Sequence, residues 1–282
     1  KEGMESADLK NILEESRRKL FIERQKRTHP HKDDKILTDW NGLMIAAMAK
    51  GAQALDEPQY TKASARAADF ILKRLRRSDG RLLHLFRDGE SPLPGYLDDY
   101  AFLVWGLIDL YEATFDVRYL KEAISLNEEM LKLFWDKKDG GLFFSGEDNE
   151  KLIMNRKEIY DGAIPSGNSV AALNLLRLGR ITSIPALEKE AEKLMNAFSS
   201  LVGDYPMGYS QLLIALDFAI GPSKEIVIAG EPGNEDTMEM VLLDNIRQVF
   251  REVLVPGNKH RSAAGQFSHS DCQLGVLKRL LE

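Results

Sequence analysis

Apolar residues recur at helical spacing in three stretches of the chain that follow one plan. Each stretch has the pattern of a helix, a short break and a second helix: Trp40–Leu75, Tyr100–Phe134 and Ser169–Phe198. In the second stretch the apolar side is marked by residues at intervals of 4, 3, 1 and 3, namely Leu103, Leu107, Leu110, Tyr111 and Thr114. This spacing places them on one face of a helix. Three successive helical hairpins predict a mainly α domain.

Short polar segments separate the predicted helices. The breaks inside the three stretches lie at Asp56–Pro58, Phe115–Val117 and Ser183–Pro185. Two connectors between the stretches, Asp79–Phe86 and Asp139–Ser145, each predict a Gly turn followed by a short strand. Each connector leads back to a new helix, so the connectors should gather at one end of the hairpins.

This succession predicts a partial α/α toroid of the six-hairpin type, in which inner helices line a funnel. A fourth inner helix is expected at Tyr205–Ala219. A closed ring needs two helices for each of six hairpins, whereas the pattern predicts only about seven or eight helices in all. The chain would therefore form little more than half a ring. We expect an exposed apolar edge, covered by another copy, another chain or a missing segment.

The two ends of the chain differ from this central pattern. Glu5–Gln25 predicts a charged amphipathic helix, and Lys26–Lys35 a polar, basic loop. The character changes at Gly221, after which the pattern predicts a strand, a helix and a second strand at Lys224–Ala229, Asp236–Phe250 and Glu252–Val255. We therefore divide the chain into a helical segment, residues 1–221, and a small α/β tail, residues 222–282.

Composition narrows the possible functions. Of 282 residues, 44% are apolar and 29% charged, which excludes a mainly disordered chain. No stretch approaches the ~18 consecutive apolar residues of a membrane span. The net charge of −6 argues against nucleic acid as a partner. A single cysteine, Cys272, excludes an internal disulfide and fits a cytoplasmic protein. The chain begins at Lys1 without an initiator Met, which indicates processing or a longer parent.

Each predicted inner helix is introduced by a cluster of polar and aromatic residues. In a toroid these clusters converge on the mouth of the funnel. Carboxylates beside aromatic rings suit sugar chemistry, because rings stack on a pyranose while carboxylates bind hydroxyls or transfer protons. We predict catalytic roles for Asp98, Asp99 and Asp161. Substrate-binding roles are predicted for Asp39, Trp40, Asn41, Tyr96, Tyr100, Tyr160, Ser166 and Asn168.

Structural roles are the alternative for several of these residues. Asp39, Asp99 and Ser166 are also ordinary N-cap types, which satisfy free backbone N–H groups at a helix start. Adjacent Asp98 and Asp99 cannot both cap one helix easily, so one of them should face the funnel. His84 alternates with leucines and is expected to point to solvent or a loop. Four other aromatic residues are expected in the core: Trp105, Trp135, Phe143 and Phe144.

No metal or cofactor is predicted. The sequence His29-Pro30-His31 followed by acidic residues resembles a ligand pattern, but it lacks a third ligand fixed elsewhere. Gly230–Gly233 lies between a predicted strand and helix but lacks the fingerprints of nucleotide-binding loops, so a structural turn is expected. Cys272 has no acid–base partner that the sequence assigns, which argues against a nucleophilic thiol.

Three ordered motifs, His29–Met44, Tyr96–Phe102 and Tyr160–Val170, closely resemble the C-terminal half of the thioredoxin-domain-containing, spermatogenesis-associated (YyaL-like) family. The resemblance covers the chain to about residue 220, with a looser match through the tail. It implies a longer parent, in which a thioredoxin-like domain precedes a six-hairpin toroid similar to N-acylglucosamine 2-epimerases and six-hairpin glycosidases. This chain would lack the thioredoxin-like domain and the first part of the toroid.

The chain departs from the family pattern in its tail. The family often carries a Cys pair around a Cys-Gln-Leu-Pro-like motif, whereas here Cys272-Gln273-Leu274 is followed by Gly275 and the earlier Cys is missing. This departure argues against a redox role for the tail. Epimerases of this fold use histidines near the funnel, and the sequence assigns no equivalent pair. A fold likeness does not by itself assign a reaction.

Two functions remain open from the sequence. The first is an epimerase- or glycosidase-like funnel that binds a glycan or another small ligand, with Asp98 or Asp99 as general acid or base and Trp40 or Tyr96 as the stacking platform. Groups from the missing half would be needed to close this site. The second is a non-catalytic scaffold that serves the thioredoxin-like domain of the parent. The sugar site requires the three inner helices to be neighbours whose starting ends face a shared bowl.

Overall fold

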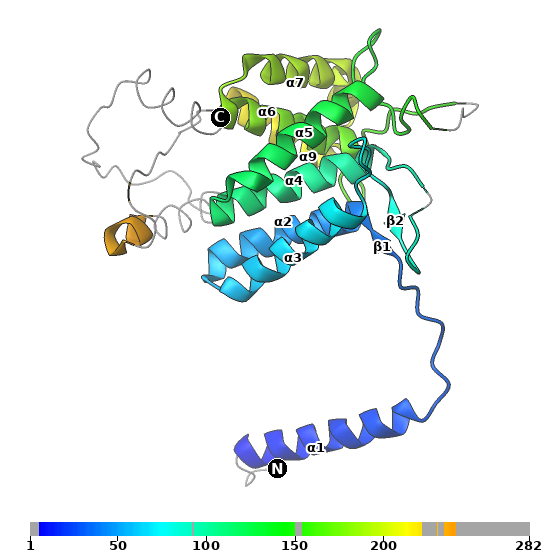
Figure 1. The fold of residues 1–282 in the computed structure, drawn as a ribbon, viewed down its shortest axis with the longest axis vertical. Coiled ribbons are helices and arrows are strands. Elements are labelled where there is room, and N and C mark those ends of the chain that lie inside the picture. Colours follow the sequence, from blue (N-terminus) through cyan, green and yellow to red (C-terminus); the bar gives the residue numbers. More distant parts are fainter. Residues whose placement is uncertain (1–5, 92, 150–153, 222–229, 231–233, 241–282) are drawn as a thin grey trace. The chain divides into compact units, whose positions relative to one another are not determined.

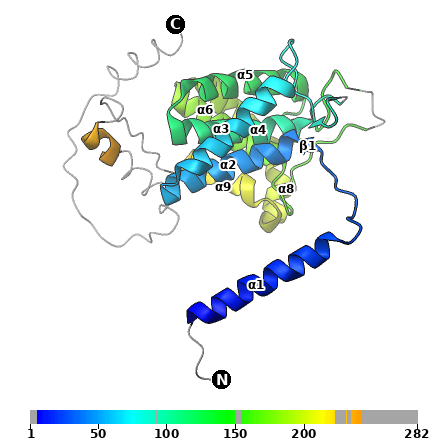
Figure 2. The ribbon, with the colours of Figure 1, turned by 60° about the horizontal axis from the view of Figure 1, so that its bottom comes forward.

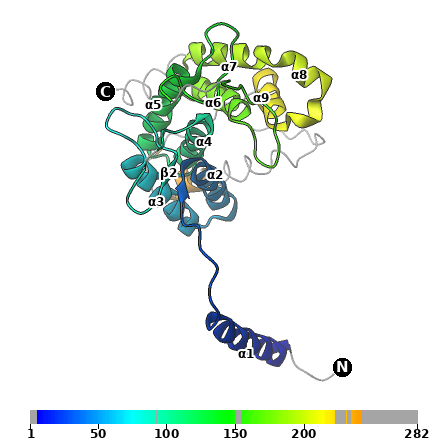
Figure 3. The ribbon, with the colours of Figure 1, turned by 90° about the vertical axis from the view of Figure 1, so that its right-hand side faces the viewer.

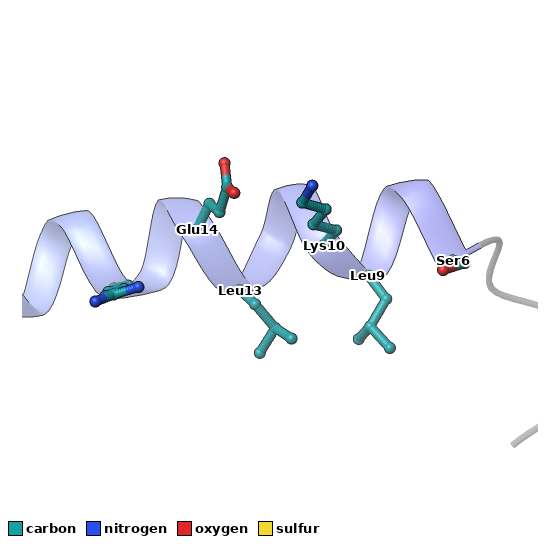
Figure 4. Close-up of a pocket in the computed structure, with 6 residues that line it drawn as sticks. Ser6, Leu9, Lys10, Leu13 and Glu14 are labelled. Atoms are coloured by element: carbon teal, nitrogen blue, oxygen red, sulfur yellow. The ribbon is translucent and has the colours of Figure 1, made fainter. Parts of the chain in front are cut away.

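The computed structural model describes residues 6–91, 93–149, 154–221, 230 and 234–240. The chain divides into two compact units, Lys1–Lys35 and Ile36–Glu282. The first unit contains α1 (Ser6–Gln25), which matches the predicted helix and has no buried residue. Leu9 and Leu13 project from one side of α1, and Lys10 and Glu14 from the other (Figure 4).

The second unit contains the three predicted hairpins (Figure 1). They are α2 (Thr38–Leu55) with α3 (Pro58–Arg74), α4 (Leu97–Thr114) with α5 (Val117–Phe134), and α6 (Gly167–Thr182) with α7 (Pro185–Ala197). After these come α8 (Ser199–Asp204), the 3-10 helix η1 (Pro206–Gly208) and α9 (Ser210–Ile220). The predicted mainly α architecture is confirmed, and the fourth inner helix begins after the 3-10 turn rather than at Tyr205.

Each inner helix of a hairpin ends on a residue with left-handed backbone. Asp56, Phe115 and Ser183 have φ angles of 50°, 54° and 55°. This conformation turns the chain away from the helix axis and stops the helix. The return helix then starts with a suitable residue, since α3 and α7 begin at Pro58 and Pro185, whose fixed φ favours a first helical position.

The inner helices run side by side in the same direction. Figure 3 shows α2, α4, α6 and α9 following one another, with α3, α5 and α7 on the outer side. At one end, the carboxylate of Asp99 in α4 accepts a hydrogen bond from the backbone of Asp39 in α2. At the other end, Arg180 of α6 donates to the carbonyl of Ala219 in α9. All connectors into the inner helices therefore lie at one end, as predicted.

Two glycines allow α2 and α4 to touch through their backbones. A Cβ atom on Gly42 would lie 2.5 Å from the carbonyl carbon of Phe102, and one on Gly106 would lie 2.7 Å from the carbonyl oxygen of Gly42. Both distances are below any real Cβ contact, so neither helix could approach its neighbour this closely with a larger residue. Gly42 and Gly106 therefore allow the close packing of α2 against α4.

The two connectors differ from each other. The first forms β2 (Leu85–Phe86), which pairs antiparallel with β1 (Ile36–Leu37), directly before the start of α2 (Figure 2). The second connector forms only an isolated bridge between Trp135 and Leu142, so the strand predicted there is wrong. Trp105 and Trp135 pack partly buried against the core. Among the described helices none is both long and apolar enough to cross a membrane.

Most of the predicted tail lies outside the described residues. This applies to both predicted strands, to the turn residues 231–233 and to Cys272. Residues 235–240 are helical, which agrees with the start of the helix predicted at Asp236. The proposed boundary at residue 221 coincides with the edge of the described part and stays a prediction.

Candidate functional site

Two neighbouring carboxylates in the first turn of α4 connect it to the inner helices on either side. Asp99 Oδ1 accepts from the backbone N–H of Asp39 at 3.0 Å, at the start of α2. Asp98 accepts from the backbone N–H of Gly167, the first residue of α6. A Cβ on Gly167 would lie only 2.3 Å from Asp98 Oδ1, so a larger residue there would displace this carboxylate. The starts of three successive inner helices are therefore adjacent.

Asp99 is fully buried and receives three donors. The backbone N–H of Tyr96 donates to it at 2.7 Å, which forms part of a capping box, and that of Asp39 at 3.0 Å. The third partner is His84, whose Nδ1 lies 3.0 Å from Asp99 Oδ2. Burial raises the pKa of Asp99, and the donors oppose that rise. Asp99 thus has the capping role considered from the sequence and, in addition, orients an imidazole.

The position of His84 differs from the sequence expectation. Its ring points to the helix starts instead of solvent and contacts the Tyr96 ring edge to face at 5.2 Å. The reason lies in the connector, because the His84 N–H donates to Leu93 O and the N–H of Thr38 donates to His84 O, both at 2.9 Å. These bonds hold the connector against the start of α2. The hydrogen bond to Asp99 raises the pKa of His84.

Asp98, like Asp39, is a partly accessible carboxyl of the cluster. Burial raises its pKa to about 7, and the charges of Asp99, Asp39 and Glu158 act in the same direction. Burial also raises the pKa of Asp39, which is half-buried. A carboxyl with this pKa is present in both protonation states near neutral pH. That property is required of a group that both accepts and donates protons.

Asp39, His84 and Asp99 also have the composition of a metal site. One ligand atom from each lies within 4.8 Å of the others. Both oxygens of Asp99, however, already accept N–H donors. The arrangement therefore fits a cluster that shares protons better than one that coordinates a cation, and the prediction of no metal stays a prediction.

Exposed aromatic residues lie at or near the starts of the inner helices. Trp40, in the first turn of α2, is 61% exposed, and Tyr160, which precedes α6, is 62% exposed. Tyr96 is partly buried and stacks on Phe144, with ring centroids 5.0 Å apart. The sequence did not indicate Tyr205, an exposed residue whose ring, like that of Tyr160, lies against Gly208. Only the chain fold between α8 and α9 brings these two tyrosines together, so sequence spacing gave no signal for the pair.

Two of the predicted substrate-binding residues lie in the core. Tyr100 is fully buried, and its hydroxyl accepts from the Leu82 N–H at 2.8 Å and from Arg81 at 3.0 Å. Asn168 is also fully buried and bonds both the N–H and the carbonyl of Leu142. Neither side chain reaches the surface, so we assign both a structural role in place of substrate binding.

Three further predicted residues are engaged by backbone groups. The Asp161 carboxylate accepts from Ser166 N–H at 2.9 Å and from Gln211 N–H at 2.8 Å, which joins the starts of α6 and α9. Ser166 is the N-cap of α6, as the alternative interpretation held. Asn41 donates to the carbonyl of Leu37 at 2.7 Å. These bonds favour positioning roles over direct chemistry. For Asp161 in particular, they favour a role in joining the starts of α6 and α9 over the catalytic role predicted from the sequence.

The chain has relatives among known proteins. No family model matches the chain. Spermatogenesis-associated protein 20 of Homo sapiens is 34% identical over 263 residues, which is 90% of this chain and 34% of that protein. The chain is a homologue of this spermatogenesis-associated protein. An uncharacterised protein of Caenorhabditis elegans is 32% identical over 241 residues, 81% of this chain and 32% of that protein. The chain thus spans about a third of the length of these relatives.

Solved structures show the same fold in carbohydrate enzymes. Cellobiose 2-epimerase from Bacillus thermoamylovorans superposes with a TM-score of 0.56 at 14% identity, covering 80% of this chain and 63% of that one. A family GH76 α-mannanase from Bacteroides thetaiotaomicron has a TM-score of 0.55 at 13% identity, covering 80% and 60%. At these identities the likeness concerns the fold alone. It confirms the toroid architecture expected from the sequence, shared by epimerases and glycosidases.

Proposed function

We propose that the starts of α2, α4 and α6 form a sugar-binding site that carries out proton-transfer chemistry of the epimerase or glycosidase type. The observation that supports this most strongly is the cluster of Asp98, Asp99 and His84, in which one carboxyl titrates near neutral pH. The exposed ring of Trp40 beside it offers a stacking surface for a pyranose. A toroid shared with sugar epimerases and glycosidases agrees with this proposal without deciding it.

In this proposal the residues have distinct roles. Asp98 is the general base or acid, because it is partly accessible and close to half-ionised near pH 7. His84 is oriented by Asp99, whose hydrogen bond raises the pKa of the imidazole and so favours its charged form. In this role His84 would stabilise negative charge that develops on a sugar oxygen. In an epimerisation, Asp98 would take the proton from C2, beside an open-chain carbonyl, while His84 donates a proton to the carbonyl oxygen, which gives an enediol. After the enediol rotates about its C2–C3 bond, the protonated Asp98 would return the proton to the opposite face of C2, and His84 would take back the proton of the C1 hydroxyl.

The decisive experiment follows proton exchange and bond cleavage together. Uncharged mono- and disaccharides are incubated with the protein in D₂O, and NMR records deuterium at C2 and newly released reducing ends. Asp98→Asn should lower the rate at least ~100-fold, the usual contribution of a general acid or base. Asp69→Asn on the outer helix α3 is the matched control and should leave the rate unchanged. Equal rates for wild type and Asp98→Asn would contradict the assignment of Asp98.

A non-catalytic scaffold is the second candidate. Exposed apolar residues on α2 and α9, the first and last of the inner helices, favour it. Met44 and Leu55 on α2 are 54% and 68% exposed, and Ile220 at the end of α9 is 77% exposed. Apolar groups of this size on the surface favour a protein contact with a second copy or with the remaining part of a longer parent, including its thioredoxin-like domain. Wild-type protein that neither exchanges deuterium nor binds any sugar would favour this scaffold.

Sedimentation velocity at several concentrations tests the same edges. Association is expected for the wild type, and Met44→Gln with Ile220→Gln should reduce it. Lys62→Gln, on the exposed side of α3, serves as a surface control. A protein that stays monomeric at every concentration would contradict the predicted apolar edge.

A further inference from the structure

The charges that act on Asp98 are of one sign, apart from a single imidazole. Asp39, Asp99 and the exposed Glu158 all disfavour its ionised form. Among the described residues, His84 alone forms an ion pair with any of Asp39, Asp98 and Asp99. Within the described part of the chain, no guanidinium or ammonium group therefore pairs with the three carboxyl groups where the inner helices begin.

This arrangement has a direct consequence for a ligand. Asp98, a partly accessible carboxyl, is held at the start of α4 by the N–H of Gly167, so its position is set by two helices. Trp40 follows Asp39 at the start of α2, where the Asp39 N–H donates to Asp99. In the proposed site, a sugar stacked on Trp40 is bound at the same helix starts as these carboxylates. There an added positive charge is attracted and an added negative charge repelled, and partial burial weakens screening by salt.

On the basis of the proposed function, we infer that this site selects sugars by charge, binding an amine-bearing sugar in preference to an uncharged one and rejecting sugars that carry a carboxylate or phosphate. Anionic sugars are normally held by Arg or Lys side chains, which give bidentate or point-charge contacts to the anion. The described part of the site presents carboxylates at the same places.

Asp98 also provides a measurable signature, the release or uptake of protons on binding, that a general affinity for polar molecules would not give. Near pH 7 this carboxyl is close to half-protonated. A bound ammonium group favours the ionised form, so binding should release protons, whereas a bound carboxylate should cause proton uptake. An uncharged sugar should change the protonation of Asp98 much less.

Calorimetry with glucose and two charged sugars, each of which differs from glucose at one carbon, tests the inference. Glucosamine, glucose and glucuronate are titrated into the full chain near pH 7, where the amine is largely protonated, in two buffers of different ionisation enthalpy. Glucosamine should bind ~10-fold more tightly than glucose with proton release, and glucuronate ~10-fold more weakly. Glu158→Gln should reduce the glucosamine-to-glucose ratio about 2-fold, since its exposed carboxylate is the most screened of the group. Glu128→Gln on the outer helix α5 should leave that ratio unchanged.

Each outcome separates this inference from the proposed function. If glucuronate binds as tightly as glucose or more tightly, the charge selection is overturned while a sugar site stands. If glucosamine binds with proton release and glucose does not bind, the charge selection is supported and the uncharged-sugar chemistry proposed above fails. If none of the three binds, both are overturned. A ratio that Glu128→Gln lowers as much as Glu158→Gln would also overturn it, because the preference would then come from overall charge.

Discussion

Carboxylates lie at both ends of the inner helices, but they have different partners and their pKa values shift in opposite directions. At the far end, Arg177 of α6 donates to Asp109 at 2.6 Å and to Glu112 at 2.7 Å, and Lys50 of α2 donates to Glu112 at 2.9 Å. At the near end, Asp98 has carboxylates for neighbours and only one imidazole close by.

The pKa values follow these surroundings. Burial alone would raise the pKa of Glu112, but the charges of Arg177 and Lys50 lower it to about 2. Burial raises the pKa of Asp98 to about 7, and the charges of Asp99, Asp39 and Glu158 add to this rise instead of opposing it. Burial therefore does not decide what a carboxylate does, because the partners supplied by neighbouring helices do. One end of the row is an ion-pair clamp, and the other holds groups ready to exchange protons.

The largest expected effect comes from breaking the clamp. Arg177→Met should lower the free energy of unfolding by about 3 kcal/mol, because it leaves the buried Asp109 and the partly buried Glu112 without their main partner. Urea unfolding at neutral pH measures this change. Arg66→Met, at an exposed position of α3, is the control.

A second variant distinguishes lost charge pairing from lost packing. Adding Glu112→Gln to Arg177→Met should recover part of the stability, since one unpaired charge is then removed. Equal stability of the single and double variants would show that packing, and not charge, accounts for the loss. The folded pKa of Glu112 lies below its unfolded value, so its contribution is present at neutral pH and is lost as the pH falls toward about 2.

The opposite sign is expected at the near end. Asp98 has a folded pKa of about 7, above its unfolded value, so its ionised form costs stability above neutral pH. Asp98→Asn should therefore raise the free energy of unfolding by about 1–2 kcal/mol at pH 8, after allowance for partial solvent access. This gain should shrink as the pH falls through 7 and vanish by about pH 4.

The test compares unfolding curves of Asp98→Asn and Asp69→Asn at about pH 8 and at about pH 4. Asp69 lies on the outer side of α3, where the same substitution removes a charge without relieving a buried carboxyl. A loss of stability in Asp98→Asn at pH 8 would mean that the carboxylate itself holds α6 through Gly167, and the contrast between the two ends would fail.

The smallest effect concerns the coupling within the near-end cluster. Asp39→Asn removes one of the charges that disfavour ionised Asp98, so the pKa of Asp98 should fall by about half a unit. The pKa of His84 should fall too, because Asp39 is one of the charges that raise it. Carboxyl and imidazole NMR titrations of this variant give both values. An unchanged pKa for both groups would show that Asp39 does not belong to the cluster.

Local patterns were sufficient for the hairpins. Helical spacing located all three, and Pro58 and Pro185 marked the start of two return helices. The same patterns indicated clusters of carboxylates and rings at the helix starts. They did not distinguish Asp98 from Asp161, since both precede or begin a helix. Asp161 differs because backbone N–H groups of Ser166 and of Gln211, fifty residues away, donate to it.

His84 shows the limit of local pattern most directly. Alternation with leucines predicts an outward side chain for an isolated strand, and that prediction fails because β2 pairs with β1 and brings the connector against α2. Tyr100 fails in the opposite way. An aromatic residue at a helix start resembles a stacking platform, yet Arg81 and the Leu82 N–H draw its hydroxyl into the core.

Short-range patterns in the sequence were enough to locate the helices of the three hairpins and their breaks, because prolines and apolar spacing act within a few neighbouring positions. The tertiary structure alone decided what the carboxylates do. A pKa depends on burial and on charges within several ångströms, and here some of those charges come from residues 60 or more positions away, as in Asp39 with Asp99 and Arg177 with Glu112. Parallel packing of the inner helices gathered cations at one end and left carboxylates facing one another at the other.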